Sequence, residues 1–416
     1  MALKSGLKLR KRNAMMLLLI IMALLVVGVW YTYKRYYALS VEQHRITVFI
    51  HGTFFTSLSA VSIKSVLQDE LDESSWYVRM MRSVRKETML LQDQVISEEG
   101  LFEVSPEQIK ACHNCDLSQD DKKFGASFIV DAYDRVARTV NQYGDFNRYY
   151  SFGWSGLLSH KKRIDAARTL YNQLIQLIQN YEKKFGVKPE ITLVAHSHGG
   201  NVAKLLVQIE RELDKNLRIK HLVMYGTPIQ SETAELVDNE VIETCISCYS
   251  DGDNVQGNDI FSSRDRTSKK KLSEIVSLVA FNSSEKRRVD VRLIYNDNPA
   301  QIGHMNMWFM GRAEKLFESL DPLPLMVLTP LIIQEIDRCR DVNDIDLHFT
   351  EARGLLTAHI CPYGQRDIKC WSDNLFHVCL PASLYARTNW NPGDKNRSVM
   401  FNLRNYTALK KAWFGE

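Results

Sequence analysis

The sequence predicts an α/β fold in which a mainly parallel central sheet is flanked by helices. Short apolar, β-branched runs such as residues 191–194 alternate with longer segments of helical periodicity such as residues 163–184. The strand-like runs are apolar almost throughout, which is typical of parallel strands covered by helices on both faces. Turns with glycine and proline separate the two kinds of segment, for example at residues 186–189.

The predicted elements follow one another along the chain in this alternation. A helical face is clearest at residues 163–184, where apolar side chains recur every three or four positions. Strands are expected at residues 45–50, 148–154, 191–194, 221–225, 241–250 and, as the last one, 289–295. Helices are expected at residues 57–71, 163–184, 202–213 and 305–320, with charged helical pieces at 79–94 and 126–140.

Length and composition allow one large core and a smaller appended unit. The chain has 416 residues, of which 45% are hydrophobic. The net charge is only +4, and much of the excess lies at the extreme N-terminus. The sequence shows no basic patch with interleaved aromatic residues, so we expect no nucleic-acid partner.

Residues 1–40 are predicted to be a basic tail followed by a transmembrane anchor. Five basic residues between positions 4 and 12 precede an uncharged stretch at residues 13–33. About 20 apolar residues in a helix cross a bilayer core. The stretch ends in aromatic residues instead of the small residues that precede a cleavage site, so we favour an uncleaved signal-anchor over a signal peptide. The basic flank predicts a cytoplasmic N-terminus and an extracytoplasmic remainder, in a periplasm or lumen.

A single serine joins a predicted strand to a predicted helix. Residues 191–194 are apolar, and the helical pattern begins at Val202. Between them lies Ser197, with the small residues Ala195 and Gly199 two positions before and after it. A sharp strand-to-helix turn has no room for larger side chains at these positions, and it exposes the hydroxyl above the sheet. The plain alternative is a serine in an ordinary helix-capping turn.

This G-x-S-x-G pattern, with alanine for the first glycine, resembles the α/β-hydrolase superfamily, in particular its lipase and esterase branch. The resemblance extends over about residues 45–320 and includes three further motifs that recur in lipase-like hydrolases. It implies an oxyanion hole made by the backbone amides of Thr53 and His198, with Phe54 as the alternative first donor. The three motifs are His51-Gly52-Thr53-Phe54, Trp154-Ser155-Gly156 and Gly226-Thr227-Pro228.

The resemblance also implies an acid and a histidine base on loops that follow later strands, in the order serine, acid, histidine. Asp253 is the predicted acid because it follows the strand at 241–250 by a few residues and precedes a short apolar residue. Asp251 is the alternative acid, and either aspartate could be only a turn former. His304 is the predicted base, since it is the one histidine just beyond the strand at 289–295. Its plain alternative is a helix N-terminal residue without a role.

No metal ion or organic cofactor is expected. His196 and His198 flank the serine, but no carboxylate or cysteine has matching ligand spacing. Two pairs of cysteines have C-x-x-C spacing, Cys112/Cys115 and Cys245/Cys248. The pairs are too far apart in sequence for a zinc ribbon. Cys245 and Cys248 of the second pair fall on opposite faces of a predicted strand, so at least one is predicted to lie in the core.

Three regions are predicted: the anchor, a hydrolase domain at residues 41–320, and a C-terminal extension at residues 321–416. The connection at about residues 72–144 is long for this fold, which predicts a cap or lid insertion. The extension contains four cysteines and several aromatic residues. Outside the cytoplasm it could form two disulfides, and it could cover the hydrolase edge or bind a protein partner.

The sequence therefore predicts a membrane-anchored serine hydrolase that cleaves carboxylic esters through an acyl-enzyme, with an acyl ester or lipid as substrate. Two alternatives remain open, because a fold does not determine its substrate. One is a catalytically inactive hydrolase-fold protein that serves as a binding module or scaffold. The other is an acyltransferase on the same fold, which passes the acyl group to an alcohol instead of water.

Overall fold

The computed structural model divides the chain into two compact units, Met1–Gln43 and His44–Glu416. Within them, the structure describes residues 16, 22–30, 43–53, 99–113, 130, 131, 133–138, 146–258, 268–275, 286–295, 302–307, 325–338, 343–352, 355–362 and 376–379.

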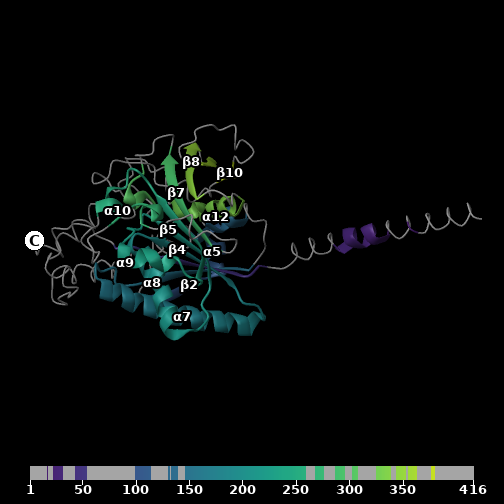
Figure 1. The fold of residues 1–416 in the computed structure, drawn as a ribbon, viewed down its shortest axis with the longest axis horizontal. Coiled ribbons are helices and arrows are strands. Elements are labelled where there is room, and N and C mark those ends of the chain that lie inside the picture. The colour runs from purple at the N-terminus through teal and green to yellow at the C-terminus, as the bar shows by residue number, and fades with distance from the viewer. Residues whose placement is uncertain are drawn as a thin grey trace, which may run out of the picture. The chain divides into compact units, whose positions relative to one another are not determined.

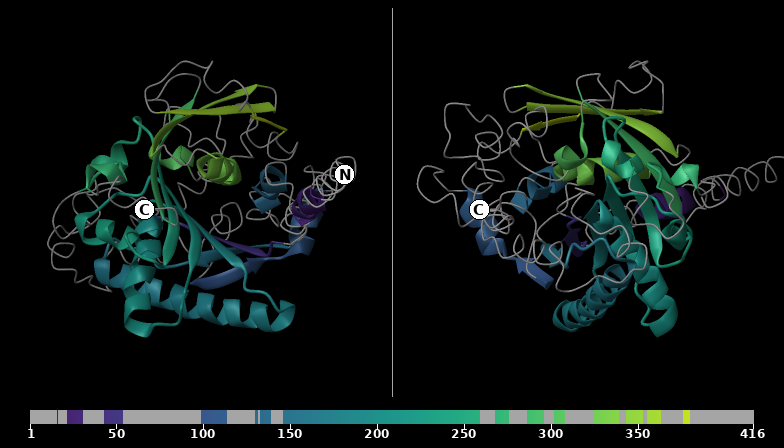
Figure 2. Two further views of the ribbon diagram at one scale, coloured as in Figure 1. Left: turned by 45° about the vertical axis from the view of Figure 1, so that its right-hand side comes forward. Right: turned by 90° about the vertical axis from the view of Figure 1, so that its left-hand side faces the viewer.

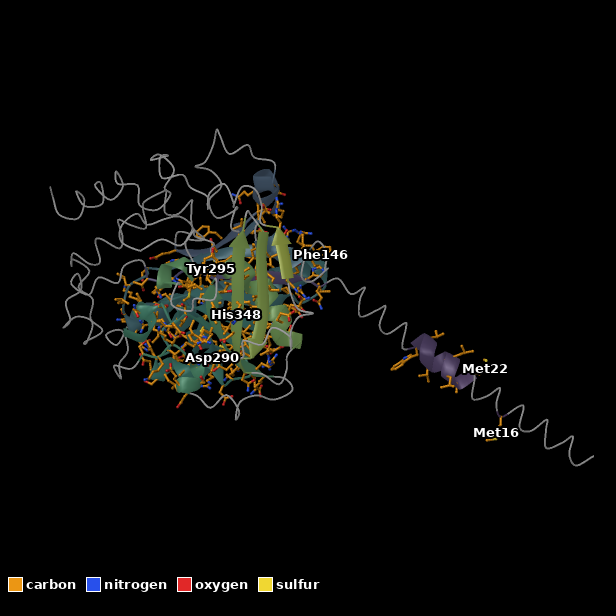
Figure 3. All side chains as sticks on the ribbon, turned by 90° about the horizontal axis from the view of Figure 1, so that it is seen from above. Met16, Met22, Phe146, Asp290, Tyr295 and His348 are labelled. Carbon is orange, nitrogen blue, oxygen red and sulfur yellow. The ribbon has the colours of Figure 1, made fainter. Side chains whose placement is uncertain are left out.

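In the first unit, residues 22–30 form a helix with exposed apolar side chains. Met22 is 55% exposed and Val29 is 68% exposed, and Figure 3 shows the side chains of Met16 and Met22. Among the residues described, no helix combines the length and the apolar character needed to span a membrane. Most of the anchor predicted within residues 1–40 lies outside the described residues.

The second unit is built on one sheet (Figure 1). The described residues contribute ten strands to it, in the order β10-β9-β8-β7-β6-β5-β4-β1-β3-β2. Its centre is parallel, and antiparallel strands lie at both edges. The parallel strands are β1 (Arg45–Ile50), β3 (Asn147–Gly153), β4 (Glu190–His196), β5 (Ile219–Tyr225), β6 (Ile242–Tyr249), β7 (Arg287–Tyr295) and β8 (Asp344–Ala352). The antiparallel strands are β2 (Gly100–Val104), β9 (Leu355–Pro362) and β10 (Phe376–Cys379). The predicted α/β fold with a mainly parallel sheet is confirmed.

Helices cover both faces of this sheet. The long helices α7 (His160–Phe185) and α8 (His198–Leu213) lie on one face, and α12 (Thr329–Arg338) lies on the other (Figure 2). The remaining described helices are α5 (Pro106–His113), α9 (Ser231–Ala234) and α10 (Asn254–Asn258), with 3₁₀ turns η2 (Glu235–Val237), η3 (Leu272–Glu274), η4 (His304–Met307) and η5 (Leu325–Leu328).

Helix α7 shows how the sequence builds this packing. Its N-terminus is capped by the Ser159 side chain, which accepts a hydrogen bond from the Lys162 amide, and it ends at Gly186 with a left-handed φ of 73°. Leu170 and Leu174 on its inner face are fully buried in one apolar cluster with residues of β1, β4 and α8. Burying each such side chain stabilises the fold by about 1.5–3 kcal/mol.

The prediction that the strand at residues 289–295 is the last is wrong. Strand β8 follows it in the sheet, parallel to β7, and β9 and β10 extend the sheet further. All three come from the segment assigned above to a C-terminal extension. Figure 3 marks Tyr295 on β7 and His348 on the neighbouring β8.

Side-chain bonds across these elements explain why they join the sheet. Arg292 of β7 binds both carboxylate oxygens of Asp346 on β8, at 2.8 and 2.7 Å. The Tyr225 hydroxyl of β5 lies 2.8 Å from the Thr329 hydroxyl at the start of α12. These pairings join residues more than 50 positions apart, so the hydrophobic pattern of the sequence gives no sign of them.

Of the segment 72–144 predicted to be a cap insertion, only part is described. Its strand β2 pairs with β3 at the edge of the sheet. Residues 133–138 are helical, and the Tyr133 ring packs edge-on against Phe49 of β1 with ring centroids 5.3 Å apart. Both pieces therefore belong to the body of the second unit.

Candidate active site

The turn between β4 and α8 has the geometry expected of a nucleophile elbow. Ser197 adopts φ 49° and ψ −131°, a conformation that costs a non-glycine residue about 1–3 kcal/mol and that the surrounding structure must hold. The Ser197 amide donates to the Tyr225 carbonyl at 2.9 Å, and the Gly200 amide donates to the Ser197 carbonyl at 3.0 Å. Bonds on both sides of the serine therefore maintain the strained turn.

Backbone segments approach one another closely around this turn, which explains its glycines. Strands β1 and β4 are neighbours, with Ile50 opposite Ala195, so the chain leaving β1 passes beside the serine. A Cβ atom at Gly52 would lie 2.5 Å from the Ser197 Cβ atom. One at Gly199 would lie 2.5 Å from the His51 carbonyl oxygen. Contact with the chain that leaves β1 thus requires the glycine at position 199 of the motif.

The structure brings two of the predicted site residues into direct contact. His304 Nδ1 lies 2.8 Å from Asp253 Oδ2, and both side chains are buried. The other carboxylate oxygen of Asp253 accepts hydrogen bonds from the amides of Val255 and Gln256, at 2.9 and 3.0 Å. Asp253 is therefore fixed at the start of α10 with one oxygen aimed at the imidazole.

Asp251, the alternative acid, lies elsewhere. Its side chain is 44% exposed and pairs with Arg292 at 3.3 Å. The turn from β6 directs the two aspartates in different directions, and only Asp253 contacts His304.

Further contacts hold the His304 loop against the serine turn. His196 Nε2 lies 3.1 Å from the His304 carbonyl oxygen, and the two rings have centroids 4.7 Å apart. Because a carbonyl only accepts, His196 Nε2 must carry a proton. Burial, reinforced by the neighbouring His304, lowers the pKa of His196 well below its usual range, so this ring is neutral. Ser250 also donates to the Ile302 carbonyl at 2.8 Å.

His304 leaves its second nitrogen available. Nε2 is buried, and no residue in the described part of the chain forms a hydrogen bond with it. If Nδ1 donates to Asp253, a neutral ring has its lone pair on Nε2. The His196 contact places this histidine beside the residue that precedes Ser197. The arrangement therefore leaves a proton acceptor on a histidine whose backbone is bonded to the residue that precedes Ser197.

Thr53 and His198, the predicted oxyanion-hole donors, flank the serine turn. Thr53 follows Gly52, which lies against Ser197, and His198 is the first residue of α8. Both are buried. The amides at a helix N-terminus favour negative charge, which suits His198 to this role. Phe54 lies outside the described residues.

Several contributors to the site were not predicted from the sequence. From the sequence His196 is expected to be neither the base nor a metal ligand, and nothing in the sequence indicates that it holds the His304 loop. His51 and Trp154 belong to two recognised motifs, but nothing in their spacing indicated the contacts between them. Cys245 and Cys248 are both free and buried on β6, which confirms the expectation that at least one lies in the core.

A glycine beside the acid and base offers a first prediction. Gly226 has φ +58°, and a Cβ atom there would lie 3.0 Å from both Asp253 Oδ2 and His304 Nδ1. Gly226→Ala should displace this pair and lower kcat for an ester substrate roughly 100-fold, the cost of a displacement of about 1 Å. The measurement is steady-state turnover of a p-nitrophenyl ester.

Gly186→Ala is the matched control for this prediction. Gly186 is also left-handed, at φ +73°, but a Cβ atom there meets nothing within 4 Å. Both variants bear a similar backbone cost of about 1–2 kcal/mol. Equal kcat values in the two variants would show that the space beside Asp253 and His304 is not critical.

Comparison with protein families gives a match that covers half of the chain. A family model described as the PGAP1-like alpha/beta domain matches residues 122–331, which is 210 of the 416 residues of the chain. The chain belongs to the PGAP1-like alpha/beta domain family. The predicted membership of the α/β-hydrolase superfamily is confirmed by this match. No curated protein matches the sequence.

The solved structures that resemble the chain include esterases and a hydrolase. An esterase from the archaeon Pyrobaculum calidifontis is 10% identical, with 75% of this chain and 67% of that chain covered and a TM-score of 0.23. A putative cell surface hydrolase from Lactobacillus plantarum is 11% identical, with 75% and 83% covered and a TM-score of 0.23. The carboxylesterase EstE1 from a metagenomic library is 12% identical, with 70% and 90% covered and a TM-score of 0.27.

Proposed function

We propose that this protein is a membrane-anchored serine hydrolase that cleaves carboxylic esters. Ser197 is the nucleophile, His304 the general base and acid, and Asp253 the carboxylate that orients His304. The observation that supports this most directly is the 2.8 Å contact between Asp253 and His304, held next to the strained Ser197 turn. An inactive scaffold would not need to maintain a buried carboxylate–imidazole pair beside a strained serine.

The proposed reaction follows from the hydrogen bonds of the site. With the Nδ1 proton directed at Asp253, His304 Nε2 takes the proton of Ser197 as the hydroxyl attacks the acyl carbon. The amides of Thr53 and His198 bind the developing oxyanion. His304 then protonates the leaving alcohol, and water hydrolyses the acyl-enzyme by the same steps in reverse.

Burial of the site favours a covered active site. Ser197 is 2% exposed and His304 is 6% exposed, so an acyl chain reaches them only if neighbouring residues move. In this proposal the cap or lid predicted within residues 72–144 opens, as in enzymes whose lids exclude water during chemistry, while β2 and residues 133–138 of the same segment stay with the sheet.

The first unit supports our proposal of a membrane location and a lipid substrate. The helix at residues 22–30 exposes apolar side chains around its whole circumference, which suits lipid better than water. A hydrolase tethered at a bilayer meets acyl esters in the lipid itself, so we propose a lipid ester as substrate. The N-terminus is cytoplasmic in this proposal, and the second unit is extracytoplasmic.

Labelling with an alkyl fluorophosphonate tests the proposal, because this reagent reacts only with an activated serine. The full-length wild type in detergent should be labelled, and Ser197→Ala should not be labelled. Equal labelling of both proteins, or none of the wild type, would refute the assignment. Product analysis with an added alcohol separates hydrolysis from acyl transfer.

A further inference from the structure

The turn that follows β1 is held by an unusual set of bonds to His51. The His51 ring lies in the core, and its Nδ1 is 2.7 Å from the carbonyl oxygen of the next residue, Gly52. On its other side, Nε2 is 3.2 Å from the backbone amide nitrogen of Trp154, at the end of β3. The imidazole thus links two strand ends that flank the site.

These partners determine where the ring carries its proton. The Trp154 amide can only donate, so His51 Nε2 accepts. A neutral imidazole with Nε2 as acceptor carries its proton on Nδ1, which then donates to the Gly52 carbonyl. Protonation of Nε2 would set two donors against each other, so this arrangement requires a neutral ring.

Trp154 also fixes His51 from a second direction. Its indole Nε1 donates to the His51 carbonyl oxygen at 2.7 Å. The two rings are stacked, with centroids 5.9 Å apart and an interplanar angle of 18°. Both residues are buried, so neither exchanges these bonds for water. His51 therefore has little freedom to rotate its ring or its backbone.

The bond from the His51 ring also orients the peptide unit between Gly52 and Thr53. The Gly52 carbonyl and the Thr53 amide belong to one planar peptide, and no cis bond occurs in the described residues. In a planar trans peptide the carbonyl and the N–H point in opposite directions. A carbonyl held by the His51 ring therefore determines the direction of the Thr53 N–H, on a turn that lies against Ser197.

We infer that His51, clamped by Trp154, is a positioning residue that aims the Thr53 amide at the oxyanion. This inference rests on the proposed function, because it assigns a purpose to a donor of that same site. His51 itself does not touch the reacting atoms. It makes the amide a preorganised donor, which is the property that gives oxyanion holes their effect.

Two substitutions at position 51 separate the two bonds of the ring. In His51→Asn the side-chain amide can still donate to the Gly52 carbonyl, whereas the bond from the Trp154 amide is lost. In His51→Gln the longer side chain can still accept from Trp154, but the donor to Gly52 is lost. Both variants lose the same ring stacking, so a purely structural role for His51 would affect them similarly.

We expect His51→Gln to lower kcat roughly 10- to 100-fold with KM nearly unchanged, somewhat less than the loss of a whole oxyanion donor. His51→Asn should stay within a few fold of the wild type. The inhibition constant of a trifluoromethyl ketone, whose hemiketal mimics the oxyanion, should rise in His51→Gln by the factor lost from kcat/KM. Thermal midpoints of the two full-length variants should agree.

The outcomes distinguish this inference from the proposed function. If the wild type is labelled by fluorophosphonate and His51→Gln keeps its kcat and inhibition constant, the positioning role is refuted while the hydrolase assignment stands. Equal losses of kcat in both variants, in step with lowered thermal midpoints, would also refute it. A wild type that is not labelled refutes the proposed function instead.

Discussion

Asp253→Asn should lower kcat by about four orders of magnitude while leaving the protein folded. The Asn side chain keeps an oxygen that can accept from the Val255 and Gln256 amides, so the start of α10 is preserved. Its amide group then faces His304 Nδ1, where a carboxylate oxygen now lies at 2.8 Å. A donor facing a donor favours the wrong tautomer of the imidazole, and Nε2 no longer accepts the serine proton.

Asp251→Asn is the control, because this residue lies two positions away on the same turn and pairs with Arg292 on the surface. Exposed ion pairs contribute only about 0–1 kcal/mol to stability. Asp251 pairs with Arg292 and not with His304, so kcat should change less than twofold. The check is kcat for a p-nitrophenyl ester at neutral pH in both variants, with labelling of Ser197 as a second readout. A loss in Asp251→Asn that equals the loss in Asp253→Asn would contradict the assignment of the acid.

These two aspartates show how much of the candidate site could be predicted from the sequence. The serine turn was predictable because steric crowding demands small residues at fixed positions, and Ala195 and Gly199 satisfy this locally. The acid was predictable only to within a loop, since Asp251 and Asp253 both follow β6. Their roles differ because Asp253 lies against His304, a residue 51 positions away. No local pattern encodes such a contact.

The C-terminal part of the sheet could not be predicted from the sequence for a different reason. Strand β8 begins by alternating polar and apolar residues, and its buried Asp346 is bound by Arg292 on β7 in a bidentate pair. Burying a carboxylate without such a partner would be costly. From the sequence alone a central strand is therefore not expected at this position. The ion pair between Asp346 and Arg292 is what allows one.

Helix α8 shows the same limitation at a single lysine. Its apolar residues Val202, Leu205 and Leu206 share the face that the periodicity predicts to be buried. Lys204 falls between them, where a solvent-exposed side chain is expected. In the structure every residue from His198 to Val207 is buried, because α7, α9 and η2 pack on α8 in addition to the sheet.

Lys204→Met should stabilise the protein by several kcal/mol at neutral pH. Lys204 is 0% exposed, and within the described residues its Nζ has no hydrogen-bond partner. Burial lowers its pKa to about 7, against the opposing influence of Cys245 and Glu232. Relative to an ordinary lysine, this shift corresponds to a cost of about 5 kcal/mol at pH 7. Methionine fills a similar volume without a charge to desolvate.

The pH dependence of the free energy of unfolding shows whether the buried Lys204 ammonium group causes the difference in stability. Between the folded pKa near 7 and the unfolded value near 10.5, the unfolded chain binds a proton at Lys204 that the folded chain does not bind. The free energy of unfolding of the wild type should therefore rise with pH across this range, by about 1.4 kcal/mol per unit. The advantage of Lys204→Met is largest at and below pH 7 and disappears as the pH approaches 10.5.

Thermal unfolding of the full-length protein in detergent, between pH 6 and 10, measures this difference. We expect Lys204→Met to raise the midpoint by roughly 5–15 °C at pH 7 and by much less at pH 10. Lys183→Met, at an exposed position on α7, is a surface substitution and should change the midpoint by no more than about 1–2 °C at any pH. A gain for Lys204→Met that stays constant with pH would show that packing, and not the removal of a buried ammonium group, accounts for the stabilisation.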